Sequence, residues 1–159
     1  MKKVVTLVVL VSAGVLIYKV ATGGPYNTAK QNFAKEEYKL AALNFQKAID
    51  QGEHVHESLV YLARIDGIKD DYEQGIARCN EAIEIAPNAS QAYYFKAILL
   101  QLDGRMGQAT SVLDELSNMP QIGKGFAIAK ISNPRPGTHE ALRPHERELR
   151  EKLLKGQAY

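Results

Sequence analysis

Hydrophobic residues follow two patterns along the chain. The first 21 residues contain a continuous apolar run from Val4 to Tyr18, which Lys2 and Lys3 precede. Beyond this run, apolar residues recur at intervals of three and four, the spacing that places them on one face of an α-helix. Short polar stretches separate these segments. The pattern predicts an apolar N-terminal segment followed by a series of short amphipathic helices.

The N-terminal run has three possible interpretations: a membrane anchor, a cleaved signal peptide and a buried core helix. Its 15 uncharged residues are few for a membrane-spanning helix, but snorkelling of Lys19 extends the span through Ala21 to 18 residues. A cleavage site is poorly formed, because Lys19 follows the apolar run directly. We therefore favour an uncleaved transmembrane anchor over residues 1–21. Cleavage before Gly23 would instead give a secreted, soluble adaptor.

The charges that flank the run indicate an orientation. Lys2, Lys3 and the amino terminus outweigh Lys19 on the other side. By the positive-inside rule, the N-terminus stays in the cytoplasm and the rest of the chain crosses the membrane. In a bacterium this places the remainder in the periplasm. Exposure on the cytosolic face stays an alternative, because the bias amounts to only a few charges.

The chain after the apolar run repeats with a period of 34 residues. Five columns align without a gap: Ala29, Ala63 and Ala97; Tyr38, Tyr72 and Met106; Ala41, Gly75 and Ala109; Phe45, Cys79 and Leu113; Ala48, Ala82 and Leu116. Small residues let two helices approach closely, and the bulkier columns fill the space between them. Each unit is therefore predicted to be a helical hairpin that stacks on its neighbours.

Polar residues mark the expected turns inside the hairpins. In the second unit the turn contains Gly67 and the segment Lys69-Asp70-Asp71, and in the third it is Asp103-Gly104-Arg105. The acid pairs Glu36-Glu37 and Asp70-Asp71 fall at such turns. We expect them to cap the following helices and to stay solvated.

These residues resemble the tetratricopeptide repeat family. The family's A-x3-F motif is matched by Ala41 to Phe45 and, in degraded form, by Gly75 to Cys79 and Ala109 to Leu113. Pro87 and, approximately, Pro120 match the proline that closes a repeat. The resemblance covers residues 22–121. It implies an all-α fold, a right-handed solenoid of about three hairpins.

The chain departs from the family pattern at several positions. Asn32 and Asp66 stand where the family prefers an aromatic residue, and Lys96 replaces an expected leucine. The first unit also lacks a closing proline. The first unit matches the family pattern least well in its first helix.

The resemblance implies a protein-binding groove lined by the first helix of each unit. The positions carried over are Tyr26, Asn27, Lys30, Phe33, Val60, Tyr61, Arg64, Ile68, Tyr94, Phe95, Ile98, Gln101 and Leu102. Lys30 and Arg64 would offer cationic points to an acidic group of a ligand. The family's clamp for a chaperone's terminal carboxylate is not expected, because tyrosines and Ile98 stand at most of its positions. The ligand should therefore be more apolar, and some of these aromatic residues are expected to pack between helices instead.

The C-terminal part adds a cap, a linker and a final helix. Phe126, Ile128 and Ile131 would form a capping helix that ends the solenoid domain, residues 22–132. Proline and glycine between residues 133 and 137 predict a linker within the C-terminal segment, residues 133–159. The final helix is predicted from Pro144 to Lys155.

Charge is divided unevenly along the 159 residues. The net charge is +2 overall, with −5 over residues 22–120 and +4 over residues 121–159. A total so small does not indicate a nucleic-acid partner. The basic final helix has a solvated face as its simplest interpretation, and contact with its own acidic solenoid, an acidic partner or anionic lipid as the alternatives.

The sequence offers little that could perform catalysis. The single cysteine, Cys79, excludes an internal disulfide and falls at a predicted core position. His54 and His56 lack a nearby third metal ligand. Phosphate-binding glycine loops and the common hydrolase and metalloprotease motifs are missing. We therefore expect no enzyme, no catalytic residues, no cofactor and no metal.

Together these features predict a non-enzymatic, membrane-anchored scaffold that binds other proteins and assists the assembly or stability of a membrane protein complex. The predicted partners are subunits of that complex. The alternative is a permanent structural accessory subunit. Ala13 and Gly14 favour this alternative, because small residues let an anchor pack against a neighbouring helix.

Overall fold

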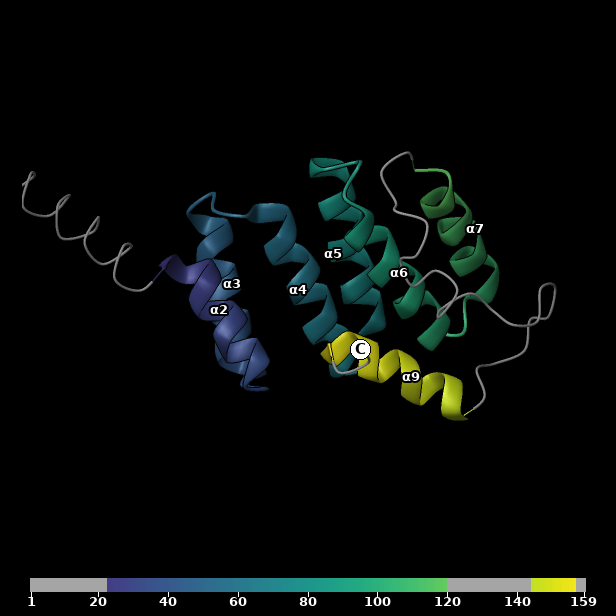
Figure 1. Cartoon of the computed structure of the whole chain (residues 1–159), viewed down its shortest axis with the longest axis horizontal. Helices are drawn as coiled ribbons and strands as arrows, with labels where there is room; N and C mark the ends of the chain where they lie inside the picture. The colour runs from purple at the N-terminus through teal and green to yellow at the C-terminus, as the bar shows by residue number, and fades with distance from the viewer. Residues whose placement is uncertain (1–22, 120–143, 157–159) are drawn as a thin grey trace, which may run out of the picture. The chain divides into compact units, whose positions relative to one another are not determined.

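The computed structural model describes residues 23–119 and 144–156 (Figure 1). Within these ranges the regular structure is helical and contains no strand, which confirms the predicted all-α class. The chain divides into two compact units, Met1–His54 and Val55–Tyr159. The predicted anchor over residues 1–21 and the predicted capping helix near Phe126 lie outside the described residues. Among the described helices, none is both long and apolar enough to span a membrane.

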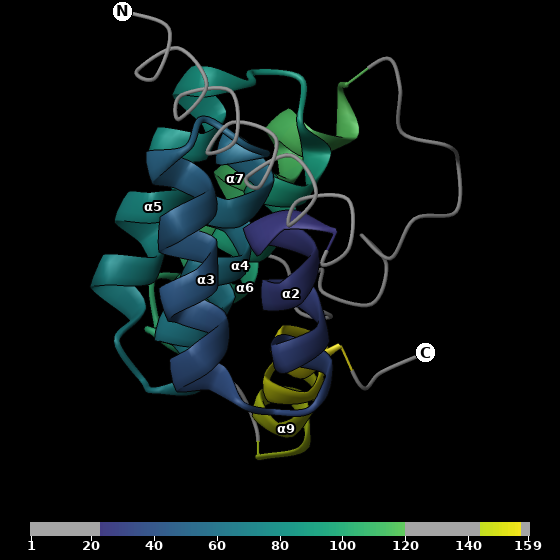
Figure 2. The ribbon, with the colours of Figure 1, turned by 90° about the vertical axis from the view of Figure 1, so that its left-hand side faces the viewer.

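Unit 1 contains one helical hairpin, formed by α2 (Gly24–Ala34) and α3 (Tyr38–Asp50), which run side by side (Figure 2). Pro25 stands in the first turn of α2, where its missing N–H would have no partner in any case. Ala29 and Phe33 of α2 are buried, as are Phe45 and two alanines of α3. The small residues on both helices allow the close packing of this hairpin.

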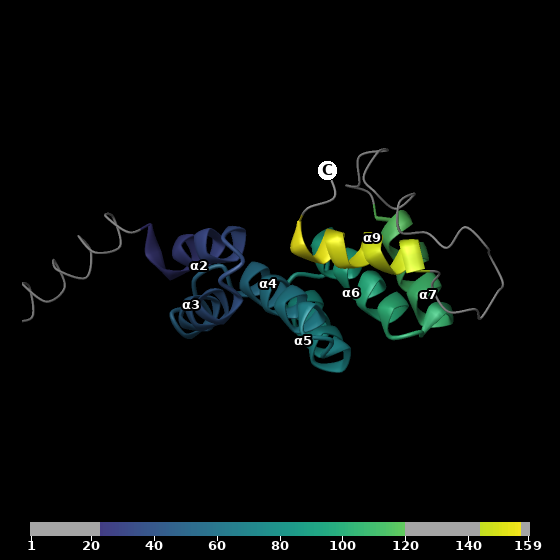
Figure 3. The ribbon, with the colours of Figure 1, turned by 90° about the horizontal axis from the view of Figure 1, so that it is seen from below.

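Unit 2 contains two hairpins and the C-terminal helix. The first hairpin is α4 (Val55–Ile68) with α5 (Tyr72–Ile85), and the second is α6 (Ser90–Leu102) with α7 (Met106–Ser117). Helix α5 packs against α6 and thereby joins the two hairpins. Helix α9 (Pro144–Lys155) has the predicted boundaries and packs on α4 and α6 (Figures 1 and 3).

The 34-residue period is the period of the hairpins. Tyr38, Tyr72 and Met106 each begin the second helix of a hairpin. The column of Ala29, Ala63 and Ala97 is completely buried. Three further columns are also buried, from Ala41, Gly75 and Ala109 to Ala48, Ala82 and Leu116, whereas Tyr38 and Tyr72 are only partly buried. The described residues therefore have a helical-repeat architecture, as the sequence predicted.

The turn between the two helices of each hairpin also repeats. Glu36, Asp70 and Gly104 occupy equivalent positions and have φ angles of 61°, 61° and 82°. This left-handed conformation favours glycine, which only the third hairpin supplies. The turn was expected to begin at Gly67, but this glycine lies inside α4, where it is buried. The prediction that Gly67 belongs to the turn is wrong.

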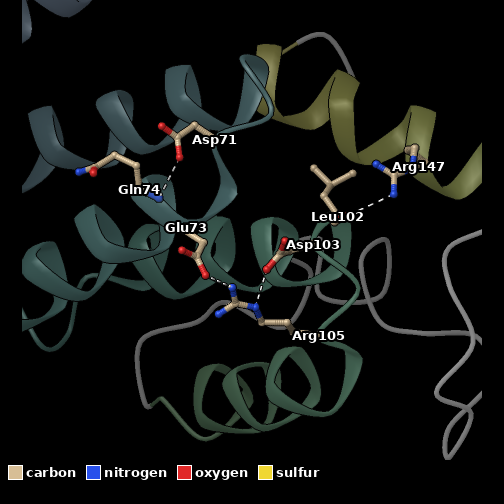
Figure 4. A network of polar contacts seen from close by, with 7 residues as sticks. All are labelled: Asp71, Glu73, Gln74, Leu102, Asp103, Arg105 and Arg147. Atoms are coloured by element: carbon tan, nitrogen blue, oxygen red, sulfur yellow. Dashed lines mark hydrogen bonds and ion pairs between the residues drawn. The ribbon is translucent and has the colours of Figure 1, made fainter.

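Only one of the four acidic turn residues caps a helix. The Asp71 carboxylate accepts a hydrogen bond from the Gln74 backbone N–H at 3.3 Å, as expected (Figure 4). Glu37 makes no such bond, because its carboxylate accepts from the side chain of Asn32 instead. Asp70 accepts from the Tyr72 hydroxyl. The exposed position of all four residues agrees with the prediction that they stay solvated.

Candidate protein-binding face

The predicted groove residues are distributed over three helices, and most of those in unit 2 are buried. Tyr26, Asn27, Lys30 and Phe33 belong to α2 in unit 1. The other nine belong to α4 and α6 in unit 2, and seven of them are buried: Val60, Arg64, Tyr94, Phe95, Ile98, Gln101 and Leu102. Tyr61 and Ile68 are partly exposed.

The four α2 residues make contacts within unit 1. Tyr26 stacks on His54 with 4.3 Å between the ring centroids, and the ammonium group of Lys30 lies 5.5 Å from the Tyr26 ring. The Asn27 amide donates a hydrogen bond to the Gly23 carbonyl oxygen at 2.6 Å. Phe33 is buried against Tyr38, edge to face. The Phe33 ring therefore belongs to the hairpin core, while Asn27 and Lys30 are exposed.

In unit 2, helix α9 covers the C-terminal halves of α4 and α6. Leu153 is 7% exposed and Leu154 is completely buried. A Cβ atom at position 67 would lie 3.0 Å from Leu154 Cδ1 and 2.4 Å from Leu99 Cδ2. Gly67 thus provides space for Leu99 of α6, which lies nearest, and for Leu154 of α9. Burying each leucine contributes about 1.5–3 kcal/mol to the docking of α9.

Arg64 of α4 binds the C-terminal end of α9. Its Nε donates a hydrogen bond to the Leu154 carbonyl oxygen at 2.8 Å. Carbonyls in the last turn of a helix have no partner within the helix, and a cation is favourable at this negative end. The Arg64 guanidinium lies 4.9 Å from the Tyr61 ring and 4.7 Å from the Phe95 ring. Two aromatic residues, one from each helix, therefore hold the cation that caps α9.

Two further arginines of α9 bind α6. Arg150 Nε donates to Gln101 Oε1 at 2.9 Å, and each of these residues is 2% exposed. Arg147 Nη2 donates to the Leu102 carbonyl oxygen at 3.1 Å (Figure 4). A buried hydrogen bond to a charged group contributes about 1.5–3 kcal/mol. These bonds fix the position of α9 along α6.

The sequence contained a signal for this docking that the interpretation of the final helix missed. Arg150 follows Arg147 by three residues, and Leu153 and Leu154 follow Arg150 by three and four, so all four lie on one side of the helix. The solvated charged face, the simplest interpretation of this helix, is wrong for Arg150, which is buried. Contact with the chain's own repeats, one of the alternatives, is what α9 makes.

Polar pairs cross the hairpins at equivalent positions. In unit 2, Arg78 Nε donates to Asp66 Oδ2 at 2.7 Å, and in unit 1, Asn44 donates to Asn32 at 3.2 Å. Burial raises the pKa of the Asp66 carboxyl, and the hydrogen bond from Arg78 opposes this rise. An ion pair and an amide pair thus occupy the position where the resembled family prefers an aromatic residue.

Arg105 joins the two hairpins of unit 2 at their turns. Its guanidinium binds Glu73 of α5 at 2.7 Å and also binds Asp103 of its own turn (Figure 4). Both acidic partners lie close to the surface, and exposed ion pairs contribute little to stability. Arg105 therefore has a structural role at the contact between the two hairpins.

The groups considered for chemistry have structural surroundings. Cys79 is completely buried, as predicted, and burial raises the pKa of its thiol to about 12. Within residues 23–119 and 144–156, no three His, Cys, Asp or Glu side chains are grouped in a way that could hold a metal ion. His56 Nδ1 lies 3.1 Å from a carboxylate oxygen of Glu57. The candidate site of this molecule is therefore the face of α4 and α6.

Similarity to known proteins adds no assignment to this face. No family model, no curated protein and no solved structure matches the chain.

Proposed function

We propose that the protein is a non-enzymatic, membrane-anchored scaffold that binds other proteins and assists the assembly or stability of a membrane protein complex. The observation that carries this proposal is the docking of α9. The face of α4 and α6 holds a helix through buried leucines, a capped carbonyl and a buried arginine–glutamine bond. Contact between an apolar surface and the apolar side of a helix is a recurring way to bind an amphipathic helix of another protein.

The repeat supports the same proposal. The hairpins keep the 34-residue period, and the resemblance of their motifs to the tetratricopeptide repeat family implies protein binding. Helix α2 begins at Gly24, shortly after the proposed anchor over residues 1–21. Such an anchor would raise the effective concentration of the repeats for membrane proteins. The charge bias favours the periplasmic side, with the cytosolic side as the alternative.

A second candidate function is a permanent accessory subunit of a membrane complex. Leu40 and Leu43 on α3 favour it, because they are 51% and 53% exposed. They are three residues apart on one helix and therefore lie on the same side of it. Two exposed leucines on the same side of a helix would give another protein an apolar contact.

Purification of the full-length chain in a mild detergent, followed by quantitative mass spectrometry, tests both functions. A scaffold should bring membrane proteins in less than stoichiometric amounts, and raised salt should remove them. A subunit should bring a fixed set in constant ratio, which Leu40→Ser with Leu43→Ser should release while the exposed control Lys39→Ser should not. A chain that brings no membrane protein contradicts both proposals.

A further inference from the structure

Helix α9 occupies the face that the proposed function assigns to partners. We propose that α9 is an intramolecular ligand, and that a partner binds by displacing it with an amphipathic helix of the same pattern. The pattern is arginine, a second arginine three residues later, and two leucines three and four residues after that. This inference rests on the proposed function and names the kind of partner that the face accepts.

The few side chains that hold α9 make it separable from the hairpins. Among its described side chains, Arg150, Leu153 and Leu154 are buried, whereas α6 alone buries nine residues. The hairpins therefore have a core of their own, which includes the completely buried Ala63 and Ala97. Helix α9 lies against this core from outside, so its release leaves the repeats with most of their packing.

An ion pair on the exposed side of α9 stabilises this helix independently of its contacts with α4 and α6. Lys152 Nζ lies 2.7 Å from Glu148 Oε1, an ion pair between residues one helical turn apart. In the sequence, 26 residues separate the end of α7 from the start of α9. This tether keeps α9 at a high effective concentration near the face. A partner must therefore bind more tightly than the isolated α9 sequence to replace it.

The face itself determines which helix can replace α9. Arg64 donates a hydrogen bond to the Leu154 carbonyl oxygen. A helix that replaces α9 must therefore place a carbonyl oxygen of its last turn beside Arg64. Gln101 offers an amide oxygen to a cationic donor, which Arg150 supplies. Gly67 leaves space beside Leu99 of α6 for a leucine of the docked helix. A basic amphipathic helix with paired leucines near its C-terminal end satisfies all three requirements.

A peptide of residues 144–156, labelled for fluorescence anisotropy, provides the probe. It is titrated against the full-length chain in detergent. Leu154→Ala in the chain weakens its own α9 and leaves the face unchanged. We expect this variant to bind the peptide at least about tenfold more tightly than the wild-type chain, because burial of a leucine contributes more free energy than a tenfold change in affinity represents. Glu151→Ala, at an exposed position of α9, is the control and should bind like the wild type.

Further variants locate the binding to the face. Gln101→Ala, added to Leu154→Ala, should remove the gain, and a peptide with Arg150→Ala should bind correspondingly weakly. Arg150→Ala in the chain is a second way to release α9, should Leu154→Ala unfold. Circular dichroism and urea unfolding confirm that each variant is folded. Equal peptide affinity for all folded chains, or no binding by any of them, overturns the proposal.

The peptide also separates this inference from the proposed function. Added to the chain purified with its membrane companions, it should release them. If companions are present and an excess of peptide leaves them bound, the scaffold proposal stands and the inference is overturned. If the peptide binds as expected but no membrane protein is purified with the chain, the scaffold proposal fails, while the inference that α9 can be displaced is supported. Sedimentation that shows dimers which the peptide dissociates identifies a second copy's α9 as the occupant and overturns the partner helix.

Discussion

Helices α2 and α4 occupy equivalent positions in the repeat, but they differ in their packing. Helix α2 buries Phe33 within its own hairpin, whereas helix α9 packs on α4. Phe33 of α2 is equivalent to Gly67 of α4, 34 residues later. The Phe33 ring is buried within its hairpin, whereas the missing side chain at Gly67 leaves space for Leu154. The comparison teaches that a residue that differs between the repeats, and not the shared repeat pattern, makes room for α9 on α4.

The charged positions of the two helices differ in the same way. Lys30 is equivalent to Arg64, and Asn27 to Tyr61. Lys30 is exposed beside a single ring, while Arg64 is 9% exposed between two rings and bonded to α9. Arginine suits this position because its planar group can stack and donate at once, which an ammonium cannot do. The same contrast between α2 and α4 predicts which substitutions should matter.

Gly67→Phe, which gives α4 the residue of α2, should have the largest effect. We expect a loss of about 4 kcal/mol in the free energy of unfolding, from overpacking against Leu99 and loss of the Leu154 contact. Urea unfolding of the full-length chain measures it. Ala77→Phe, at an exposed position of α5, should change stability by less than about 0.5 kcal/mol. A similar loss for both variants would show that Gly67 has no special role.

Arg64→Ala should lower the free energy of unfolding by about 3 kcal/mol, because it removes a charged hydrogen bond and contacts with two rings. The equivalent change Lys30→Ala should cost about 0.5 kcal/mol, since its one ring contact is exposed to solvent. Arg64→Lys should recover only part of the loss, because it keeps the charge and loses the stacking. Equal losses at positions 30 and 64 would contradict the difference between the two helices.

The stability that the Arg78–Asp66 ion pair contributes should depend on pH, whereas the contribution of the Asn44–Asn32 amide pair should not. Arg78→Ala should cost about 2 kcal/mol at pH 7, because it leaves the Asp66 carboxylate without its hydrogen bond. Removing Arg78 also removes a cause that lowers the pKa of Asp66, so burial raises this pKa further above 3.8. Asn44→Ala, the equivalent change in unit 1, should cost about 1 kcal/mol or less.

The sign of the pH dependence follows from the direction of the shift. A carboxyl whose folded pKa is raised contributes stability that is full below its unfolded pKa and is lost as pH rises through the folded pKa. The cost of Arg78→Ala should therefore shrink as pH falls below about 4, where the Asp66 carboxyl is protonated in both states. Urea unfolding of the wild-type chain and of the Arg78→Ala variant at pH 7 and pH 3.5 measures this cost. A cost that does not change between the two would contradict the role of Asp66.

Much of the fold could be predicted because it depends on local spacing. The alanines at 29, 63 and 97 and the helix starts at 38, 72 and 106 follow one period, so the hairpins were visible in the sequence. The boundaries of α9 could be predicted for the same reason, since Pro144 and Gly156 mark its ends.

The candidate site could be predicted only in part, because it depends on contacts between distant residues. Gln101 was a predicted groove residue, but its partner Arg150 lies 49 residues later. Periodicity describes a helix and its neighbours, and it carries no information on where a separate helix docks. Gly67 was misinterpreted for a related reason. Glycine commonly marks a turn, and only the position of Leu154 reveals that this one creates space inside a helix.

The turns at positions 36, 70 and 104 provide the smallest and most local test of the comparison between hairpins. Gly104 has a φ of 82° and open space around it, so Gly104→Ala should cost about 1 kcal/mol through backbone strain alone. Glu36→Gly should instead stabilise unit 1 by about 0.5 kcal/mol, since glycine adopts its φ of 61° without strain.

Gly107 is the matched control, because it also has open space but lies within α7 without a positive φ. Gly107→Ala should stabilise the chain by about 0.5 kcal/mol through helix propensity. Thermal and urea unfolding of the three variants measure these differences. Opposite signs at positions 104 and 107 would attribute the effect to backbone conformation, since added bulk is the same at both. A loss of stability for Glu36→Gly would mean that the first turn depends on its side chain, and the equivalence of the three turns would then be limited to their backbone.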